Sequence, residues 1–419
     1  MFGRGTARYA PTVAYLEPVA TAHWPIFRLP ASRSPLPMID TARDLDALVD
    51  RCLAAEAVAL DTEFVWERTF VPALGVVQVG LGPDDVHVVD AANIDSLEPL
   101  GRLLADAGTQ KILHDAGQDL QILARATGAR PRNVFDSQRA AGLVGLSATS
   151  SLQDLVQWAT GVRLEKGETR TDWLRRPLSD NQVEYALDDV RYLPAVREKL
   201  LAEAAARGRL DWVAAEMARY EAPDLFEPAD DMDAVDRLKV AGIGRLSGRD
   251  RAVLRHLAAW REREARDLDR TRRMVLPDEG LLDLAARAPR TDDDLARTPL
   301  TDKQRARFGP GILAAVADGL EAEPEAVERR GRPGPEDERD AARLLLAQAF
   351  LAGRCAVAGV DPALVATKAA LKEIVDAGPE AVATRLTGWR AGFVGDDLAA
   401  LLRGDLAVRL DGPDGWPAA

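Results

Sequence analysis

The chain has 419 residues, of which 47% are hydrophobic and 29% are charged, and this length exceeds a single compact core and predicts two or three folded domains. The formal charge of −13 excludes a uniformly basic surface of the kind that binds nucleic acid along a whole protein. The presence of only two cysteines excludes a disulfide framework, and the absence of any apolar run of about eighteen residues argues against a membrane span.

The first 37 residues show no helical periodicity and carry three prolines near their end. We expect 1–37 to be a flexible extension, and it lacks the pattern of a signal peptide. A capped helix is predicted to start near Thr41, shortly after Met38, so we hypothesise that translation of the native protein starts at Met38.

Residues 38–222 carry the pattern of an α/β domain, in which a mixed sheet is flanked by helices. Short apolar runs bounded by Gly, Pro and Asp predict strands at 57–60, 76–81 and 86–89. Amphipathic stretches predict the helices that follow, at 97–107, 120–126, 137–146, 152–160 and 180–206.

Two proline-containing breaks divide the rest of the chain into two small all-helical domains. The segments 223–236 and 324–337 are predicted linkers. Helical domains are expected at 237–323 and 338–410, followed by a frayed tail at 411–419. From Arg237 to Leu320 there are 18 Lys and Arg residues against 13 Asp and Glu, so this stretch is locally basic in an acidic chain.

Two acidic residues stand at the end of the first predicted strand. Asp61 and Glu63 are two residues apart, so their side chains share one face of the strand. Two adjacent carboxylates are unfavourable unless a cation neutralises them, and Mg²⁺ or Mn²⁺ prefers carboxylate oxygen. The four histidines have no ligand-like spacing, so any metal is expected to be held by oxygen. An acidic turn would explain the pair equally well.

Two further acidic elements follow along the chain. Asp119 stands early in a predicted helix after a short strand at 111–113, where an aspartate can simply cap the helix. Tyr185 and Asp189 are four residues apart on a helix that begins near Ser179, which places them on one face. Each element alone is compatible with a purely structural role.

The order and spacing of these elements resemble the DEDD exonuclease superfamily. A D-x-E, an Asp and a Y-x-x-x-D occur in that order, with about 56 and about 70 residues between them. Glu184 stands where the other branch of the superfamily has a histidine, so Tyr185 matches the tyrosine branch. The run 166–178, which includes Thr171-Asp172-Trp173, is similar to the block that precedes the third motif in the ribonuclease D family.

This resemblance implies hydrolysis of the terminal phosphodiester by two divalent cations, Mg²⁺ or Mn²⁺, with release of a nucleoside 5′-monophosphate. Asp61 would bridge both cations. Glu63 and Asp189 would complete the ligands of one, and Asp119 would hold the other through water. Tyr185 would orient the attacking water without losing its own proton.

The C-terminal half resembles the HRDC family, whose members are small helical bundles that assist nucleic-acid binding. The resemblance rests on the helical spacing of Leu254, Leu257 and Trp260 and on the basic run that follows. Residues 338–410 are similar to the degenerate second HRDC-like domain of ribonuclease D. Phe64 and Trp66, beside the D-x-E, would stack on terminal bases or belong to the core. The candidate phosphate contacts, which are equally explained as a solvated helix face, are Arg261, Arg263, Arg266, Arg270, Arg272 and Arg273.

The sequence therefore predicts a 3′→5′ exoribonuclease that matures the 3′ ends of tRNA precursors and other small structured RNAs. It is expected to act as a monomer in the cytoplasm, because two widely separated cysteines suit a reducing compartment, and to have no membrane partner. A DNA exonuclease of the proofreading type is the enzymatic alternative. A catalytically inactive RNA-binding scaffold is the non-enzymatic one.

Overall fold

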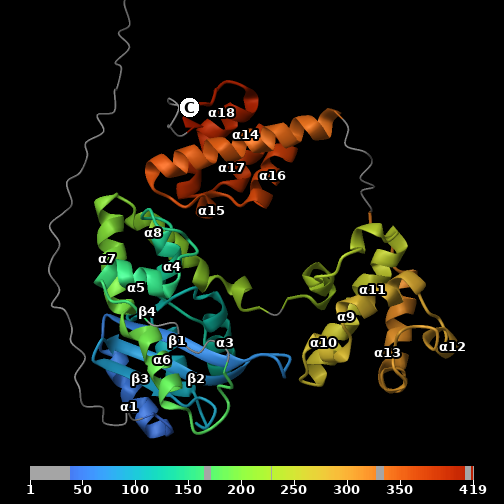
Figure 1. Ribbon diagram of the computed structural model, residues 1–419, viewed down its shortest axis with the longest axis horizontal. Helices are drawn as coiled ribbons and strands as arrows, with labels where there is room; N and C mark the ends of the chain where they lie inside the picture. Colours follow the sequence, from blue (N-terminus) through green and yellow to red (C-terminus); the bar gives the residue numbers. More distant parts are fainter. Residues whose placement is uncertain (1–37, 165–170, 228, 327–334, 411–416, 419) are drawn as a thin grey trace, which may run out of the picture. The chain divides into compact units, whose positions relative to one another are not determined.

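The computed structural model describes residues 38–164, 171–227, 229–326, 335–410 and 417–418. The predicted extension 1–37 and residues 166–170 of the run 166–178 lie outside the described residues, as do much of the second predicted linker and of the tail. Figure 1 follows the chain from an α/β domain through a first helical bundle (yellow) to a second helical domain (orange to red). The predicted fold class, a mixed sheet flanked by helices and followed by all-helical domains, is confirmed.

A mixed sheet forms the centre of the α/β domain. Its described strands are β1 (Ala57–Val65), β2 (Ala73–Gly82), β3 (Asp85–Val89), β4 (Gln110–Leu113) and β5 (Val134–Asp136). They lie in the order β3-β2-β1-β4-β5. β1 pairs antiparallel with β2 and parallel with β4, so the strand that carries the D-x-E is central. The predicted strands correspond to β1 to β4, whereas β5 has only three residues and was not predicted.

Helices pack around this sheet, and the side-chain caps explain where two of them begin. Thr41 and Ser179 accept hydrogen bonds from backbone N–H groups in the first turns of their helices. The predicted helix 180–206 is divided at Tyr192 because Pro194 suits a first helical turn and not a helix interior. The helices are α1 (Ala42–Leu53), α2 (Glu98–Ala105), α3 (Gly117–Thr127), α4 (Ser137–Ala141), α5 (Leu152–Thr160), α6 (Asp180–Arg191), α7 (Leu193–Ala206) and α8 (Leu210–Met217).

The first helical bundle has its own hydrophobic core, built around the long helix that carries Leu254, Leu257 and Trp260. Ala234 is buried in the same core, so part of the predicted linker 223–236 packs with the bundle. The bundle consists of η3 (Asp231–Arg237), η4 (Ile243–Arg245), α9 (Gly248–Asp267), α10 (Arg272–Val275), α11 (Asp278–Arg287), α12 (Asp292–Leu295) and α13 (Asp302–Glu321). The two short helices before it, η1 (Ala218–Glu221) and η2 (Pro223–Leu225), pack against the core of the α/β domain.

The second helical domain is built on a long helix, α14 (Pro335–Ala358). By length and composition its stretch Asp337–Ala358 could cross a membrane, with a mean hydropathy of 1.4. Phe350, Leu351 and Cys355 of this helix are buried in the protein core, which explains its apolar character. The other elements are α15 (Pro362–Val365), α16 (Lys368–Ala377), η5 (Pro379–Ala381), α17 (Val382–Arg385), the π-helical η6 (Ala391–Gly395), α18 (Asp396–Arg403), β6 (Arg409–Leu410) and β7 (Pro417–Ala418).

The second helical domain shares one continuous hydrophobic core with the α/β domain. Arg209, before α8, is buried and donates to the carbonyl oxygen of Leu143 at 2.6 Å and to that of Gly359 at 2.9 Å. Asp361 accepts a hydrogen bond from the backbone N–H of Ala148 at 2.7 Å. The sequence predicted a separate domain at 338–410, and these contacts instead join it to the α/β domain.

Candidate active site

Asp61 and Glu63 lie on β1, on the face of the sheet that α6 covers. Helix and sheet come close because Gly80 of β2 has no side chain: a Cβ atom there would lie 2.9 Å from the carbonyl oxygen of Val190 in α6. Gly75 provides a second close approach, since its Cβ would lie 2.6 Å from the carbonyl oxygen of Trp173. These two glycines set the distance between the first and third motifs.

α6 presents Tyr185 and Asp189 to the D-x-E, as their four-residue spacing predicts. The Tyr185 hydroxyl donates a hydrogen bond to the Asp189 carboxylate. Trp173 is buried and its ring centroid lies 6.2 Å from that of Tyr185, so the 171–173 run supports the phenol ring. Figure 1 shows α6 crossing the sheet near β1, β2 and β3.

Asp119 lies in the first turn of α3, which has no side-chain N-cap of its own. The Thr62 hydroxyl, from the middle of the D-x-E, donates to the Asp119 carboxylate. Asp136, the last residue of β5, accepts from the backbone N–H of Ala116 at 3.1 Å and holds the turn that leads into α3. Sequence reasoning missed Thr62 and Asp136. The signal available for Thr62 was its place between two acidic residues.

Asp61, Glu63 and Asp189 bring carboxylate oxygens within 4.8 Å of one another, and we call these three residues the carboxylate trio. A set of donors that consists only of carboxylate oxygens fits a hard divalent cation such as Mg²⁺ or Mn²⁺. Asp119 is not part of the trio, although its charge acts on Asp61 and Glu63.

The trio strongly disfavours negative charge when no cation is bound. Burial, followed by the charges of Asp119, Asp189 and Glu63, raises the pKa of Asp61 well above its ordinary value. Burial and the neighbouring aspartates raise the pKa of Glu63 to about 8. The pKa of Asp189 rises to about 7 and that of Asp119 to about 6, in both cases mainly through burial. Cation binding would supply the missing positive charge.

Burial, assisted by the neighbouring charges of Asp189, Glu63 and Asp61, raises the pKa of Tyr185 above its ordinary value. The phenol therefore keeps its proton throughout the physiological pH range. A protonated phenol can donate a hydrogen bond, as Tyr185 does to Asp189.

The predicted nucleic-acid contacts fall into different environments. Trp66 is 65% exposed, just beyond the end of β1, whereas Phe64 is half-buried within the strand. The prediction that Arg261 contacts phosphate is wrong. Arg261 is 4% exposed and donates to Asp278 at 2.7 Å and to the carbonyl oxygen of Leu276, so it cannot reach RNA. Its helical spacing placed it toward the core of the bundle.

The other basic candidates also separate. Arg266 pairs with Asp231, and Arg272 pairs with Glu262. Both guanidinium groups lie over the ring of Phe70, at 5.3 and 4.6 Å from its centroid. Arg263 and Arg270 are exposed and form no salt bridge within the described part of the chain.

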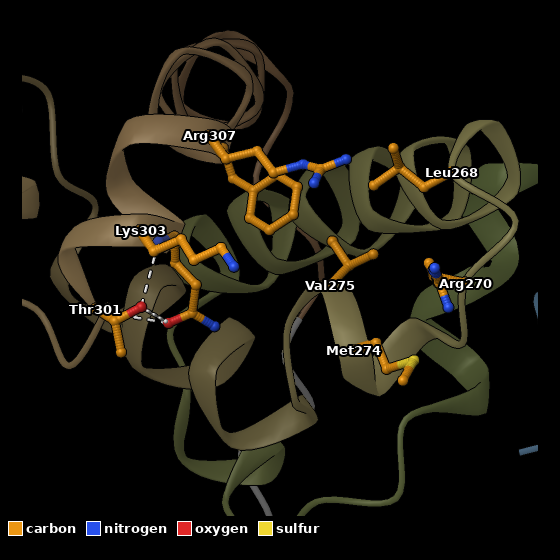
Figure 2. A pocket seen from close by; sticks show the side chains of 9 residues that line it. Leu268, Arg270, Met274, Val275, Thr301, Lys303 and Arg307 are labelled. Carbon is orange, nitrogen blue, oxygen red and sulfur yellow. Dashed lines mark hydrogen bonds between the residues drawn. The ribbon is translucent and has the colours of Figure 1, made fainter. Parts of the chain in front are cut away.

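Arg270 lines a groove of about 630 Å³ in the first bundle, which we call the basic groove. Figure 2 shows the side chains of Arg270, Lys303 and Arg307 spread around the groove, with Val275 and Leu268 between them. None of these three cations forms a salt bridge to another described residue. The guanidinium group of Arg307 lies over the ring of Phe308, 5.5 Å from its centroid. Lys303 and Arg307 were not singled out from the sequence because α13 lies outside the basic run after Trp260.

Comparisons with known proteins cover most of the chain. Residues 36–205 match the family model of 3′-5′ exonucleases, and residues 250–316 match that of HRDC domains. The chain is 37% identical over 362 residues to ribonuclease D of Desulfotalea psychrophila, and this alignment covers 86% of the chain and 96% of that protein. It is 39% identical over 380 residues to ribonuclease D of Gluconacetobacter diazotrophicus, and this alignment covers 90% of the chain and 95% of that protein. The crystal structure of Escherichia coli RNase D, an exoribonuclease involved in structured RNA processing, is similar with a TM-score of 0.76 and 27% identity, and the match covers 88% of this chain and 99% of that one.

Proposed function

The chain belongs to the ribonuclease D family and is a metal-dependent 3′→5′ exoribonuclease, and we propose that Asp61, Glu63, Asp119, Tyr185 and Asp189 are its catalytic residues. The observation that carries this assignment is the carboxylate trio. Its members come from a strand and from a helix more than a hundred residues further along the chain, yet their oxygens lie within 4.8 Å of one another.

The site fits two divalent cations, either Mg²⁺ or Mn²⁺. When bound, such a pair neutralises charge on the reacting phosphate and lowers the pKa of the attacking water. Asp61, Glu63 and Asp189 would hold one cation, because their oxygens already lie within 4.8 Å of one another. Asp119 would contribute to the second from the position in which Thr62 holds it.

Tyr185 positions the attacking water. Its phenol keeps its proton, and the hydrogen bond to Asp189 fixes where the hydroxyl oxygen points. The oxygen still has a lone pair for a water molecule, so Tyr185 can align that water with the terminal phosphodiester. Cleavage there leaves the phosphate on the released nucleotide as a 5′-monophosphate.

We propose that the substrates are the 3′ ends of tRNA precursors and other small structured RNAs. The Escherichia coli relative is described as acting in structured RNA processing. The basic groove offers Arg270, Lys303 and Arg307, which form no salt bridge to any described residue, as contacts for phosphate. Trp66 offers an exposed ring beside the D-x-E for a terminal base. In this role the first bundle would bind the body of the RNA while its 3′ end reaches the trio.

We also propose that the enzyme works as a monomer in the cytoplasm. Cys52 and Cys355 are both free and buried, which suits a reducing compartment. Size-exclusion chromatography with light scattering tests the oligomeric state, and a stable dimer would contradict the first part of the proposal.

The function is tested by digesting a 5′-labelled RNA with a single-stranded 3′ tail beside DNA of the same sequence, with Mg²⁺ or Mn²⁺. We expect stepwise shortening of the RNA, and faster cleavage of DNA would support the proofreading alternative. Asp61→Asn should abolish hydrolysis and retain RNA binding. Asp188→Asn is the matched control, because Asp188 adjoins Asp189 but is outside the trio and pairs with Arg191. Wild-type turnover by Asp61→Asn would contradict the site.

A further inference from the structure

Gln78 of β2 is a buried polar side chain whose amide group has no hydrogen-bond partner in the described part of the chain. The residue is 0% exposed, and neither Oε1 nor Nε2 is paired with any described residue. A buried amide without partners loses its hydration and gains nothing in return, so it destabilises the fold. Buried polar groups are almost always satisfied, and this exception therefore calls for an explanation.

The position of Gln78 relates it to the active site. β1 and β2 pair so that Gln78 stands directly opposite Asp61. Residues opposite one another on antiparallel strands point to the same face of the sheet, with Cβ atoms about 4.5–5.5 Å apart. Gly80, two residues further along β2, lies on this face and contacts Val190 of α6. The amide of Gln78 is therefore enclosed between the D-x-E strand and the helix that carries the third motif.

Asp61 differs from the two other aspartates of the site in its hydrogen bonds. Asp119 accepts from the Thr62 hydroxyl, and Asp189 accepts from the Tyr185 hydroxyl. Asp61 accepts only from a backbone N–H among the described residues. One aspartate thus lacks a side-chain donor, and the amide opposite it lacks an acceptor.

We propose that Gln78 is a positioning residue for Asp61, whose carboxylate accepts a hydrogen bond from Nε2 of Gln78 when cations occupy the site. This bond fixes the orientation of the carboxylate toward the cations. The inference rests on the proposed function, because it assumes that Asp61 is a metal ligand. Loss of a partner that orients a metal ligand typically weakens metal binding by about 10–100-fold.

The test is Gln78→Met, which keeps the length of the side chain and removes its amide. Three quantities are measured: the Tm in EDTA, the Kd for Mn²⁺ by calorimetry without RNA, and kcat and KM for RNA. We expect an unchanged or higher Tm, a Kd raised about 10-fold or more, and a lower kcat with KM unchanged. If Gln78 only filled space, Gln78→Met would not raise the Kd for Mn²⁺ while leaving Tm unchanged or higher.

Gln110→Met is the matched control. Gln110 begins β4 and pairs with Ala57, the first residue of β1, four residues before Asp61. Its amide is satisfied, since it donates to Asn133 at 3.1 Å and accepts from Arg197. We expect this variant to lose Tm and to bind Mn²⁺ as the wild type does, which is the opposite pattern.

A Gln78→Met protein that binds Mn²⁺ with wild-type affinity would overturn the proposal. So would a loss of Tm as large as that of Gln110→Met, because it would show that Gln78 contributes to packing. Gln78→Leu serves as the second variant if the methionine protein does not fold, with the same expected pattern. Failure of the wild-type protein to bind Mn²⁺ would overturn the cation site itself, and the role of Gln78 with it, and this result is distinct from a defect confined to the variants.

Discussion

The Glu216 carboxylate accepts a hydrogen bond from Nε1 of Trp389, which is 2.8 Å away and 173 residues further along the chain. The same carboxylate pairs with Arg139 at 2.7 Å and with Arg390 at 2.7 Å, and its side chain is 2% exposed. Trp389 also stacks on Trp212, with ring centroids 4.5 Å apart. The buried charge of Glu216 therefore adds to the shared core and to the hydrogen bonds of Arg209 and Asp361 that join the second helical domain to the α/β domain.

Glu216→Ala is expected to destabilise the whole protein, since it leaves two arginines partly buried without their counter-charge. Breaking a buried ion pair on one side costs about 3–5 kcal/mol. Urea unfolding monitored by tryptophan fluorescence measures the loss. Glu373→Ala is the control: its ion pair with Arg385 is more than half exposed and is worth about 1 kcal/mol or less. Equal effects of the two substitutions would show that Glu216 does not join the domains.

Tyr185→Phe is expected to lower kcat about 100-fold, because the attacking water loses the group that orients it. The affinity for Mn²⁺ should stay within twofold of the wild type, as the carboxylates remain. Tyr192→Phe is matched in chemistry and lies at the C-terminal end of the same helix, outside the site, so it should keep full activity. Single-turnover kinetics and calorimetry provide the two readouts, and loss of Mn²⁺ binding in Tyr185→Phe would refute a purely orienting role.

The metal-free protein is expected to lose stability as the pH rises from about 6.5 to 8. Burial raises the pKa of Glu63 from 4.5 in the unfolded chain to about 8 in the folded one, so the folded state binds the proton more tightly. The contribution of Glu63 to the stability of the folded protein is therefore fully present below pH 4.5 and is lost as the pH rises through about 8. The contribution of Asp189 is lost in the same way as the pH rises through about 7. His114 has a lowered pKa and opposes this trend only below about 6.5.

Thermal unfolding in EDTA across this pH range measures the decline. Glu63→Gln should flatten the curve, because the amide does not titrate. Mn²⁺ added at pH 8 should raise Tm, since the cation binds the folded state alone. A Tm in EDTA that rises toward pH 8 would contradict the electrostatic account of the trio.

Arg270→Ala and Lys303→Ala are each expected to weaken RNA binding by a similar factor for all sequences. If each cation contacts one phosphate, each substitution should lower the slope of log K against log[salt] by about 1. Arg287→Ala, which removes an exposed arginine paired with Asp283 on α11, is the control and should leave the slope unchanged. Binding is measured by fluorescence anisotropy with inactive Asp61→Asn protein, and unaltered slopes would exclude the basic groove as the RNA contact.

The strands and helices of the α/β domain could be predicted well because their patterns are local. The caps at Thr41 and Ser179 mark helix starts directly in the sequence, and the alternation around Asp61 defines a strand face. The five catalytic candidates were found through order and spacing, since each had an ordinary structural explanation alone. The structure adds the spatial convergence of three of them.

Features that depend on tertiary contact could not be predicted. Arg261 looked like a surface cation because it is charged, and its buried ion pair with Asp278 of α11 has no local signal in the sequence. The predicted boundary at 338 did not reveal that Trp389 packs against Trp212, because two residues so far apart leave no local signal. Gln78 also looked like one polar residue in an apolar strand until the strand register placed it opposite Asp61.

The close contact that Gly80 allows between β2 and α6 limits how far the active site can change shape when the substrate binds. The strand next to the D-x-E and the backbone of α6 touch there, so the two sides of the trio cannot separate without opening the hydrophobic core. The three carboxylates of the trio are thus already together without a bound cation, and no closing movement is needed to bring their oxygens within 4.8 Å of one another. Conformational adjustment is therefore expected of the RNA, whose 3′ end has to fit carboxylates that are already in place.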